Sequence, residues 1–268
     1  MDNTFDEPIS SGCTVGIMQP YFIPYWGYFA HINQCDFWIV FDQPKYSRKT
    51  WLNRNYVQNA RGERDLISLP VTFQSSLTKT IRDAVIQPEA LHDTWLIQKL
   101  SHYAANHYTR PVRNIIGEAY DLTKSNRLAE LNTNILSKIC AYLNIEFKYL
   151  YSSQIDYDID SVKESGDWAF EISKALDAQK YLNPLSGLPI FDPKKFETQN
   201  IELMFFKTNG FPFTRSNENQ PLHFSIIDTI LRWPPEEIKK AITNNIELLS
   251  WENAALEFNS KRGEEKNQ

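Results

Sequence analysis

A strand, a helix and a second strand fit within the thirty residues from Cys13 to Asp42, and this order constrains the fold more than any other feature. CTVGIM is a short apolar run, YWGYFAHINQ has helical character, and DFWIVFD is rich in aromatic and β-branched residues. Two strands joined by one helix are expected to be parallel, with a right-handed crossover. The sequence therefore predicts an α/β domain.

The rest of the chain continues the alternation. Two strands, 66–73 and 78–86, are expected to form a hairpin outside the main sheet, and helical periodicity dominates residues 89–143. Then follow, in chain order, a strand, a helix, two strands and two helices at 147–151, 167–176, 180–184, 201–206, 224–233 and 234–245. This pattern predicts a mainly parallel sheet with a Rossmann-like start and a helical insertion.

Domain boundaries follow from composition. We expect a disordered N-terminal tail at 1–13, one α/β domain at 14–250 with its helical insertion at about 89–143, and a polar C-terminal tail at 251–268. The acidic, polar start is unlike a signal peptide, and no apolar run is long enough for a membrane span.

Charge and cysteine content limit the kinds of partner and the cellular compartment that the sequence suggests. A net charge of −5 argues against general nucleic-acid binding. Three widely spaced cysteines form neither a disulfide framework nor a CxxC site, which favours a reducing cytoplasm. The histidine and aspartate spacings do not match a metal site, so none is predicted.

The stretch QPYFIPYWGY, residues 19–28, raises the main functional question. It leaves the carboxyl end of the first strand, where open parallel sheets bind ligands. Gly27 could let a ligand approach the helix start, and the rings of Tyr21, Tyr25 and Tyr28 suit a base or a sugar. The alternative is a rigid aromatic corner that only fills space. For the cluster as a whole, the sequence favours a binding site.

A basic loop after the second strand supports that interpretation. Its arginines could hold a phosphate or carboxylate, its asparagines could bond hydroxyls or an amide, and the aspartate could act as a general base. The alternative is a solvated loop that keeps the protein soluble. The residues concerned are Asp42, Arg48, Trp51, Asn53, Arg54 and Asn55.

These two stretches resemble the WbqC-like family. The resemblance rests on MQPYFIPYWGYFAHINQCDFWIVFD and KTWLNRN, and on the later blocks KYLNPLSG, FDPKKF, IELMFF and FSIIDTI, over roughly Val15 to Trp233. It adds Gln19, Tyr181, Ser225 and Asp228 to the expected substrate-binding residues. It implies a role in surface-polysaccharide or O-antigen (lipopolysaccharide) biosynthesis, or in a related small-molecule pathway, and it names no reaction.

The PYWGY turn is also laid out like the HxGH turn of nucleotidyltransferases, with Tyr25 and Tyr28 in place of the two histidines. A tyrosine can donate a hydrogen bond but cannot be a cation, so this similarity concerns layout alone. It leaves the use of ATP, and any other cofactor, open. His31 and His223 are the candidate proton carriers beside Asp42.

Three functions follow from these features. The leading one is a cytoplasmic transferase that acts on an amino sugar or a sugar nucleotide. The second is a non-catalytic protein that binds the same sugar or a pathway partner. The third, weaker, is an RNA-linked role of the basic stretch with Trp51 and Tyr46. The oligomeric state is left open.

Overall fold

The computed structural model describes residues 12–72, 79–103, 108–210, 213 and 224–265, with side chains up to residue 260. Its centre is a six-stranded sheet of order β10–β9–β8–β1–β2–β7. Five strands are parallel and β10 is antiparallel to β9, which confirms the predicted α/β class. The strands are β1 Thr14–Met18, β2 Phe37–Val40, β7 Tyr149–Tyr151, β8 Lys180–Pro184, β9 Glu202–Thr208 and β10 Ile246–Ser250.

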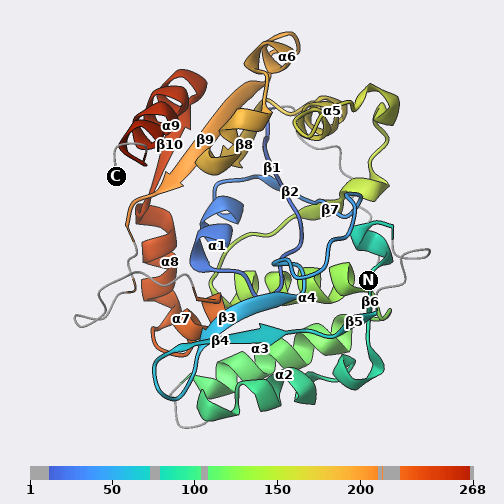
Figure 1. The fold of residues 1–268 in the computed structure, drawn as a ribbon, viewed down its shortest axis with the longest axis vertical. Coiled ribbons are helices and arrows are strands. Elements are labelled where there is room, and N and C mark those ends of the chain that lie inside the picture. The colour runs from blue at the N-terminus through green and yellow to red at the C-terminus, as the bar shows by residue number, and fades with distance from the viewer. Residues whose placement is uncertain (1–11, 73–78, 104–107, 211–212, 214–223, 266–268) are drawn as a thin grey trace.

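Helices cover both faces of this sheet (Figure 1). Alternate side chains of β2 point to opposite faces, so Trp38 and Val40 join one core and Phe37 and Ile39 the other. The first core is closed by α1 Trp26–Ile32, α4 Leu128–Tyr142, α7 Ile226–Ile230 and α8 Pro235–Asn244. The second is closed by α5 Asp167–Ala175, the 3-10 helix η6 Leu185–Ile190, α6 Pro193–Glu197 and α9 Trp251–Glu265.

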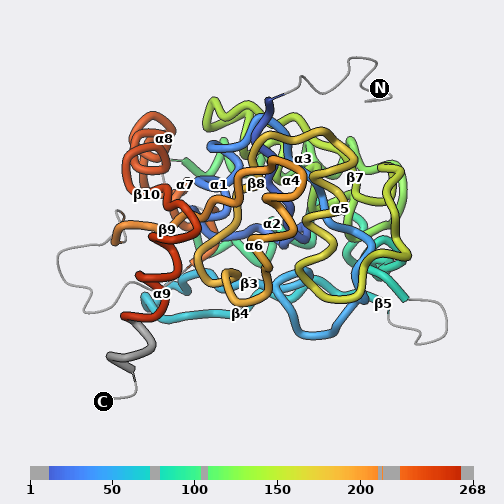
Figure 2. Tube along the Cα trace, turned by 90° about the horizontal axis from the view of Figure 1, so that it is seen from above, coloured from blue at the N-terminus to red at the C-terminus, as the bar shows by residue number. Residues whose placement is uncertain are grey.

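The segment between β2 and β7 forms a second layer beside the sheet. Its strands are β3 Arg54–Gln58, β4 Arg64–Ser68, β5 Val71–Thr72 and β6 Val85–Ile86. Its helices are α2 Asp93–Lys99, α3 Thr109–Leu122 and α4, which also closes the first core. Short 3-10 turns of this segment lie at η1 Ile81–Asp83, η2 Pro88–Ala90 and η3 Ser101–Tyr103, and two more, η4 Ser152–Gln154 and η5 Ile159–Ser161, follow β7. Figure 2 shows β3 and β4 at the outer edge of the molecule, with α2, α3 and α4 behind them.

Two parts of the chain differ from the sequence prediction. The expected single hairpin is two antiparallel pairs, because β4 pairs with β3 in the stretch interpreted as a polar loop. Residues 251–265, expected to be a polar tail, form α9, because Trp251, Ala254 and Phe258 recur at helical spacing and pack on the second core.

Candidate functional site

The sheet splits between β1 and β8 at its carboxyl end. β1 stays paired with β2 as far as Met18, and β8 stays paired with β9 as far as Pro184. The pairing between β1 and β8 stops earlier, at Gly16 and Leu182. The two chains then leave for opposite faces, β1 into α1 and β8 into η6. Neighbouring strands with this arrangement form the switch point where open α/β sheets bind ligands.

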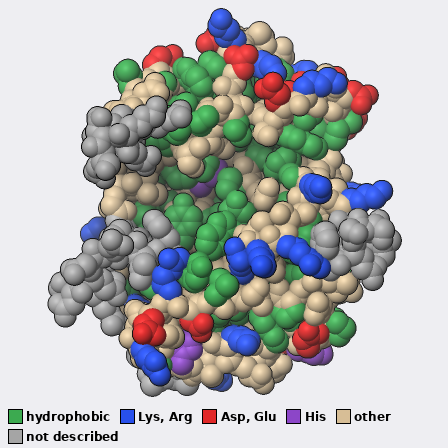
Figure 3. Space-filling model, in the orientation of Figure 1, with side chains coloured by type: hydrophobic (Ala, Val, Ile, Leu, Met, Phe, Trp, Pro, Cys, Tyr) green, Lys and Arg blue, Asp and Glu red, His purple; other side chains and the backbone are tan. Residues whose placement is uncertain are grey.

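The surface above this split is hollowed. Figure 3 shows a hollow, lined mainly by hydrophobic side chains, in the middle of one face of the molecule. Lys and Arg side chains form a row below the hollow, over the position of β3 and β4 (Figures 1 and 3). A ring-bearing ligand with an anionic group matches an apolar hollow with a cationic edge.

The stretch 19–25 leaves β1 as a tightly held elbow. The side-chain amide of Asn55 donates to the carbonyls of Phe22 (3.1 Å) and Ile23 (2.9 Å). The amide of Asn132 donates to the carbonyls of Pro20 and Leu52, both at 2.8 Å. Ile23 has φ +39°, a left-handed conformation that a β-branched residue rarely adopts. The elbow is therefore a rigid corner whose conformation two buried asparagines maintain.

The tyrosine rings of residues 19–28 have different surroundings. Tyr28 is buried, and its hydroxyl donates to the Gln19 carbonyl at 2.8 Å. A Cβ at Gly27 would lie 2.3 Å from the Tyr25 ring, so Gly27 leaves room for that ring and not for a ligand. Tyr21 is half-buried, and burial raises its hydroxyl pKa, which keeps it neutral. The Tyr21 hydroxyl and the Gln19 amide form no hydrogen bond with any described residue, so both can serve a ligand.

His31 lies beneath the split on the α1 side. Its ring is 1% exposed and packs between Trp38 and Phe206, with centroids 4.8 and 4.7 Å away. Its Nε2 is 2.8 Å from the Leu182 carbonyl, so the neutral tautomer carries its proton there. Burial lowers the His31 pKa to about 4. The structure thus gives the expected proton carrier a packing role that holds α1 to β8.

Asp42 also has a structural environment. It is 1% exposed, and its Oδ1 accepts from Ser152 Oγ (2.9 Å) and from the Ser153 amide (3.1 Å). Its Oδ2 accepts from Ser153 Oγ at 2.7 Å. These bonds tie the end of β2 to the turn after β7. The carboxylate expected to act as a base is therefore occupied by hydrogen bonds to its neighbours.

The basic loop lies against the elbow, and its side chains divide into two groups. Asn53 and Asn55 face inward, where the Asn53 amide donates to the Leu69 carbonyl at 3.0 Å. Arg48 and Trp51 are exposed. Arg54 is half-buried, and its guanidinium forms no ion pair or hydrogen bond with any described side chain. Arg54 is therefore the cation of this loop that is best placed to receive an anion.

On the β8 side, sequence reasoning selected Tyr181 and missed Asn183. Tyr181 is buried, stacks on Phe196 at 5.8 Å, and donates its hydroxyl to Asn183 Oδ1 at 2.9 Å. Asn183 and the exposed Ser186 follow the last residue of β8 that pairs with β1. The sequence NPLSG, residues 183–187, places polar residues at the end of a buried strand, and this pattern could have identified them.

The expected residues near the C-terminus lie close in sequence to a backbone contact between the Ile226 amide and the Pro24 carbonyl of the elbow. Ser225 is buried and caps α7 by accepting from the Ile227 amide at 3.2 Å. Asp228 is buried beside Tyr103, whose hydroxyl lies between the Asp228 carboxyl and the Gln58 carbonyl. Arg232 also contacts this carboxyl, at 3.4 Å. His223 lies outside the described residues.

Burial raises the pKa of Asp228 to about 6, even though Tyr103, the Gln58 amide, Arg232 and His102 favour the ionised form. The native carboxyl therefore stabilises the fold below its unfolded pKa of 3.8, and this contribution is lost as the pH rises through about 6. We expect the free energy of unfolding of the wild type, relative to Asp228→Asn, to be about 2 kcal/mol higher near pH 4 than near pH 7. Urea unfolding at the two pH values measures this difference, and a constant difference would contradict the raised pKa.

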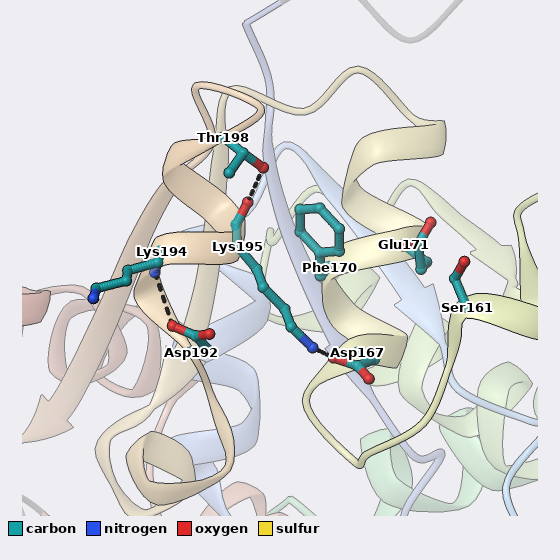
Figure 4. Close-up of a pocket in the computed structure, with 8 residues that line it drawn as sticks. All are labelled: Ser161, Asp167, Phe170, Glu171, Asp192, Lys194, Lys195 and Thr198. Atoms are coloured by element: carbon teal, nitrogen blue, oxygen red, sulfur yellow. Dashed lines mark hydrogen bonds and ion pairs between the residues drawn. The ribbon is translucent and has the colours of Figure 1, made fainter.

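A second hollow lies between α5 and α6 (Figure 4). Its volume is about 350 Å³, and charged side chains line it. Lys195 pairs with Asp167, Lys174 pairs with Glu171 at 3.1 Å, and Asp192 caps α6. Two of the acidic groups beside this hollow are thus paired with lysines, and the split in the sheet lies elsewhere. The hollow at the split between β1 and β8, which we call the crevice, is therefore the better candidate site.

Fold and crevice together define an α/β protein with helices on both faces of its sheet and a candidate ligand site at the switch point. Residues 19–240 match the WbqC-like protein family, and the chain belongs to this family. It is also similar to an uncharacterized protein of Mycobacterium tuberculosis, Rv1507c, with 25% identity over 198 residues, 74% of this chain and 83% of that protein. No solved structure matches it.

Proposed function

We propose that this chain is an enzyme that binds an amino sugar or a sugar nucleotide in the crevice between β1 and β8 and transfers a group to it. The biosynthesis implied by the family resemblance is that of a surface polysaccharide of the O-antigen type, or of a related small molecule. The observation that carries the proposal is the split of the sheet at its switch point.

The residues around the crevice fit such a ligand. Tyr21 offers an apolar ring and a neutral hydroxyl, and the Gln19 amide can both donate and accept. Ser186, an exposed residue that follows β8, is a further candidate hydroxyl. Arg54 supplies a cation for a phosphate or carboxylate. Asp42 and His31 then act as supports of the crevice and not as its acid and base.

A panel of nucleotides, sugar nucleotides and free amino sugars tests the proposal by thermal unfolding. A ligand at a hundredfold excess over its dissociation constant stabilises the native state by about 2.7 kcal/mol. For a chain of this size, that corresponds to a rise in Tm of roughly 5–10 °C. We expect this rise with a sugar nucleotide or an amino sugar for the wild type, and much less for Arg54→Ala and Tyr21→Ala.

Arg110→Ala, which removes an exposed arginine from α3, is the matched control and should keep the full response. Stabilisation by ATP alone would point instead to an ATP-using activating enzyme. No response to any member of the panel would contradict a small-molecule site in the crevice.

A non-catalytic binding protein is the second candidate, and one observation favours it. The described ionisable groups expected to move protons, Asp42 and His31, are both engaged in internal hydrogen bonds. A stabilising sugar that is recovered unchanged after incubation with acyl, phosphoryl and glycosyl donors would favour this candidate over the transferase.

A further inference from the structure

Positive charge is concentrated in one segment of this acidic protein. Residues 44–68 contain six basic and two acidic side chains, a net charge of +4. The whole chain carries −5, so the remainder carries −9. The segment comprises the loop after β2 and the β3–β4 hairpin. Such a separation of charge on one molecule gives it a cationic side that attracts anionic surfaces.

The hairpin presents part of this charge on one surface. Strand residues alternate between faces, and Val57 and Ile67 point inward to the first core. Opposite them, one surface carries the side chains that we call the outer hairpin face. It consists of Arg54, Tyr56 and Gln58 from β3 and Arg64, Leu66 and Ser68 from β4.

An apolar strip runs across this face. Tyr56 lies directly opposite Leu66 in the β3–β4 register, and the Trp51 ring meets Tyr56 edge-on at 6.0 Å. Trp51 is 44% exposed and Leu66 is 41% exposed. The hairpin already buries its inner face in the first core, so the exposed parts of these side chains lie outside that core. Large exposed apolar groups beside polar ones are typical of interaction surfaces.

Four cations around the strip have no ion-pair partner in the described part of the chain. Of the described side chains, none forms an ion pair with Lys45, Lys49, Arg61 or Arg64, whereas ion pairs form at several places elsewhere. Arg64 lies over the Tyr56 ring, with its guanidinium carbon 3.9 Å from the centroid. This contact holds a cation at the level of the apolar strip.

We propose that the outer hairpin face, with Trp51 and the loop 45–49, docks onto an anionic lipid surface. Basic side chains that surround exposed tryptophan and leucine are the combination that binds the headgroup region of a bilayer. Single-stranded nucleic acid fits less well, because Leu66 offers no ring to a base and Arg64 covers one face of Tyr56. In the described part of the chain, no helix is long and apolar enough to cross a membrane, so this contact is peripheral.

The docking surface lies on the same side of the molecule as the candidate crevice. Figure 3 shows the hollow and the row of Lys and Arg side chains on one face. Docking through the hairpin therefore brings the mouth of the crevice close to the lipid surface. A substrate attached to a lipid would be within reach there. The docking itself does not depend on the crevice being an active site.

Flotation of the full chain with vesicles tests the proposal. Vesicles of phosphatidylcholine alone are compared with vesicles that contain about 30% phosphatidylserine, at low and at physiological salt. We expect binding to the anionic vesicles, weakened by salt, and little binding to the neutral ones. Each basic group near the surface contributes about a factor of five to partitioning, so Lys49→Gln with Arg64→Gln should lower it about thirtyfold.

A second double variant tests the contribution of the apolar strip. Trp51→Ser with Leu66→Ser should lower partitioning about tenfold, because both side chains would lose apolar burial in the interface. Lys240→Gln with Leu256→Ser removes one exposed cation and one exposed leucine from α8 and α9, and should change nothing. Circular dichroism checks that each variant is folded.

Two results would overturn the proposal. One is equal partitioning onto neutral and anionic vesicles, or onto neither. The other is a combination of two observations: the double variant Trp51→Ser with Leu66→Ser binds vesicles as well as the wild type, and a single-stranded oligonucleotide displaces the vesicles. That combination would identify a polymeric anion as the partner. The flotation assay contains no sugar ligand. A failure to bind vesicles therefore contradicts the docking proposal and leaves the proposed function untouched.

Discussion

Replacing Asn55 with leucine is expected to lower the free energy of unfolding by about 4 kcal/mol. The Asn55 amide bonds the carbonyls of Phe22 and Ile23, and its Oδ1 accepts from the Tyr56 amide at 2.8 Å. Leucine leaves these three groups unsatisfied, each at a cost of about 1–3 kcal/mol. It also releases Ile23 from a left-handed conformation that is unfavourable by itself.

Urea unfolding measures the loss, and Asn253→Leu on the exposed surface of α9 is the matched control. The control should stay within about 0.5 kcal/mol of the wild type. A loss below about 1 kcal/mol for Asn55→Leu would mean that these bonds do not maintain the elbow. If they do, the same variant should also lose ligand binding, because Gln19 and Tyr21 belong to the elbow.

Acid should destabilise the chain through His31. Its pKa falls from 6.5 in the unfolded chain to about 4 in the native state. Between these values the unfolded chain binds a proton that the native chain does not. The stability present above pH 6.5 is therefore lost as the pH falls toward 4. We expect a loss of about 2.5 kcal/mol between pH 7.5 and pH 4.5 from this group.

The measurement compares wild type and His31→Gln across that pH range. The variant is less stable near neutral pH, because the packing between Trp38 and Phe206 is disturbed, but it should lack this acid-dependent component. His92→Gln, which replaces an exposed imidazole before α2, should keep it. An imidazole resonance of His31 that titrates near pH 6.5 would contradict the buried, neutral ring. Asp228 changes the free energy of unfolding in the opposite direction, since its contribution grows as the pH falls. Single variants at His31 and at Asp228 are therefore needed to separate the two contributions.

Several residues of the predicted site have structural contacts that the sequence pattern did not indicate. The position of residues 19–28 after β1 followed from the βαβ pattern, and the structure places them at the carboxyl end of the sheet. The tertiary roles of Gly27, His31 and Asp42 could not follow from that pattern. Each depends on a partner far away in the sequence or on a ring orientation, such as the Leu182 carbonyl for His31.

The opening stretch is both a packed corner and the edge of a candidate site. Its backbone is held by Asn55 and Asn132, which lie 32 or more residues further along the chain. Those bonds leave Tyr21 and Gln19 beside the split in the sheet. The two explanations that the sequence offered as alternatives are therefore compatible, since a rigid corner positions groups for a ligand at low entropic cost.

The sequence by itself determined the α/β class, the parallel start and the helical insertion, because hydrophobic periodicity is a local property that fixes which face of each element is buried. The sequence also showed the family membership, because this rests on the order of the amino acids in residues 19–240. Only the tertiary structure decided the strand order, the early end of the β1–β8 pairing and the separation of the loop into inward asparagines and outward cations. These features arise from contacts between distant segments, and no local pattern encodes such contacts.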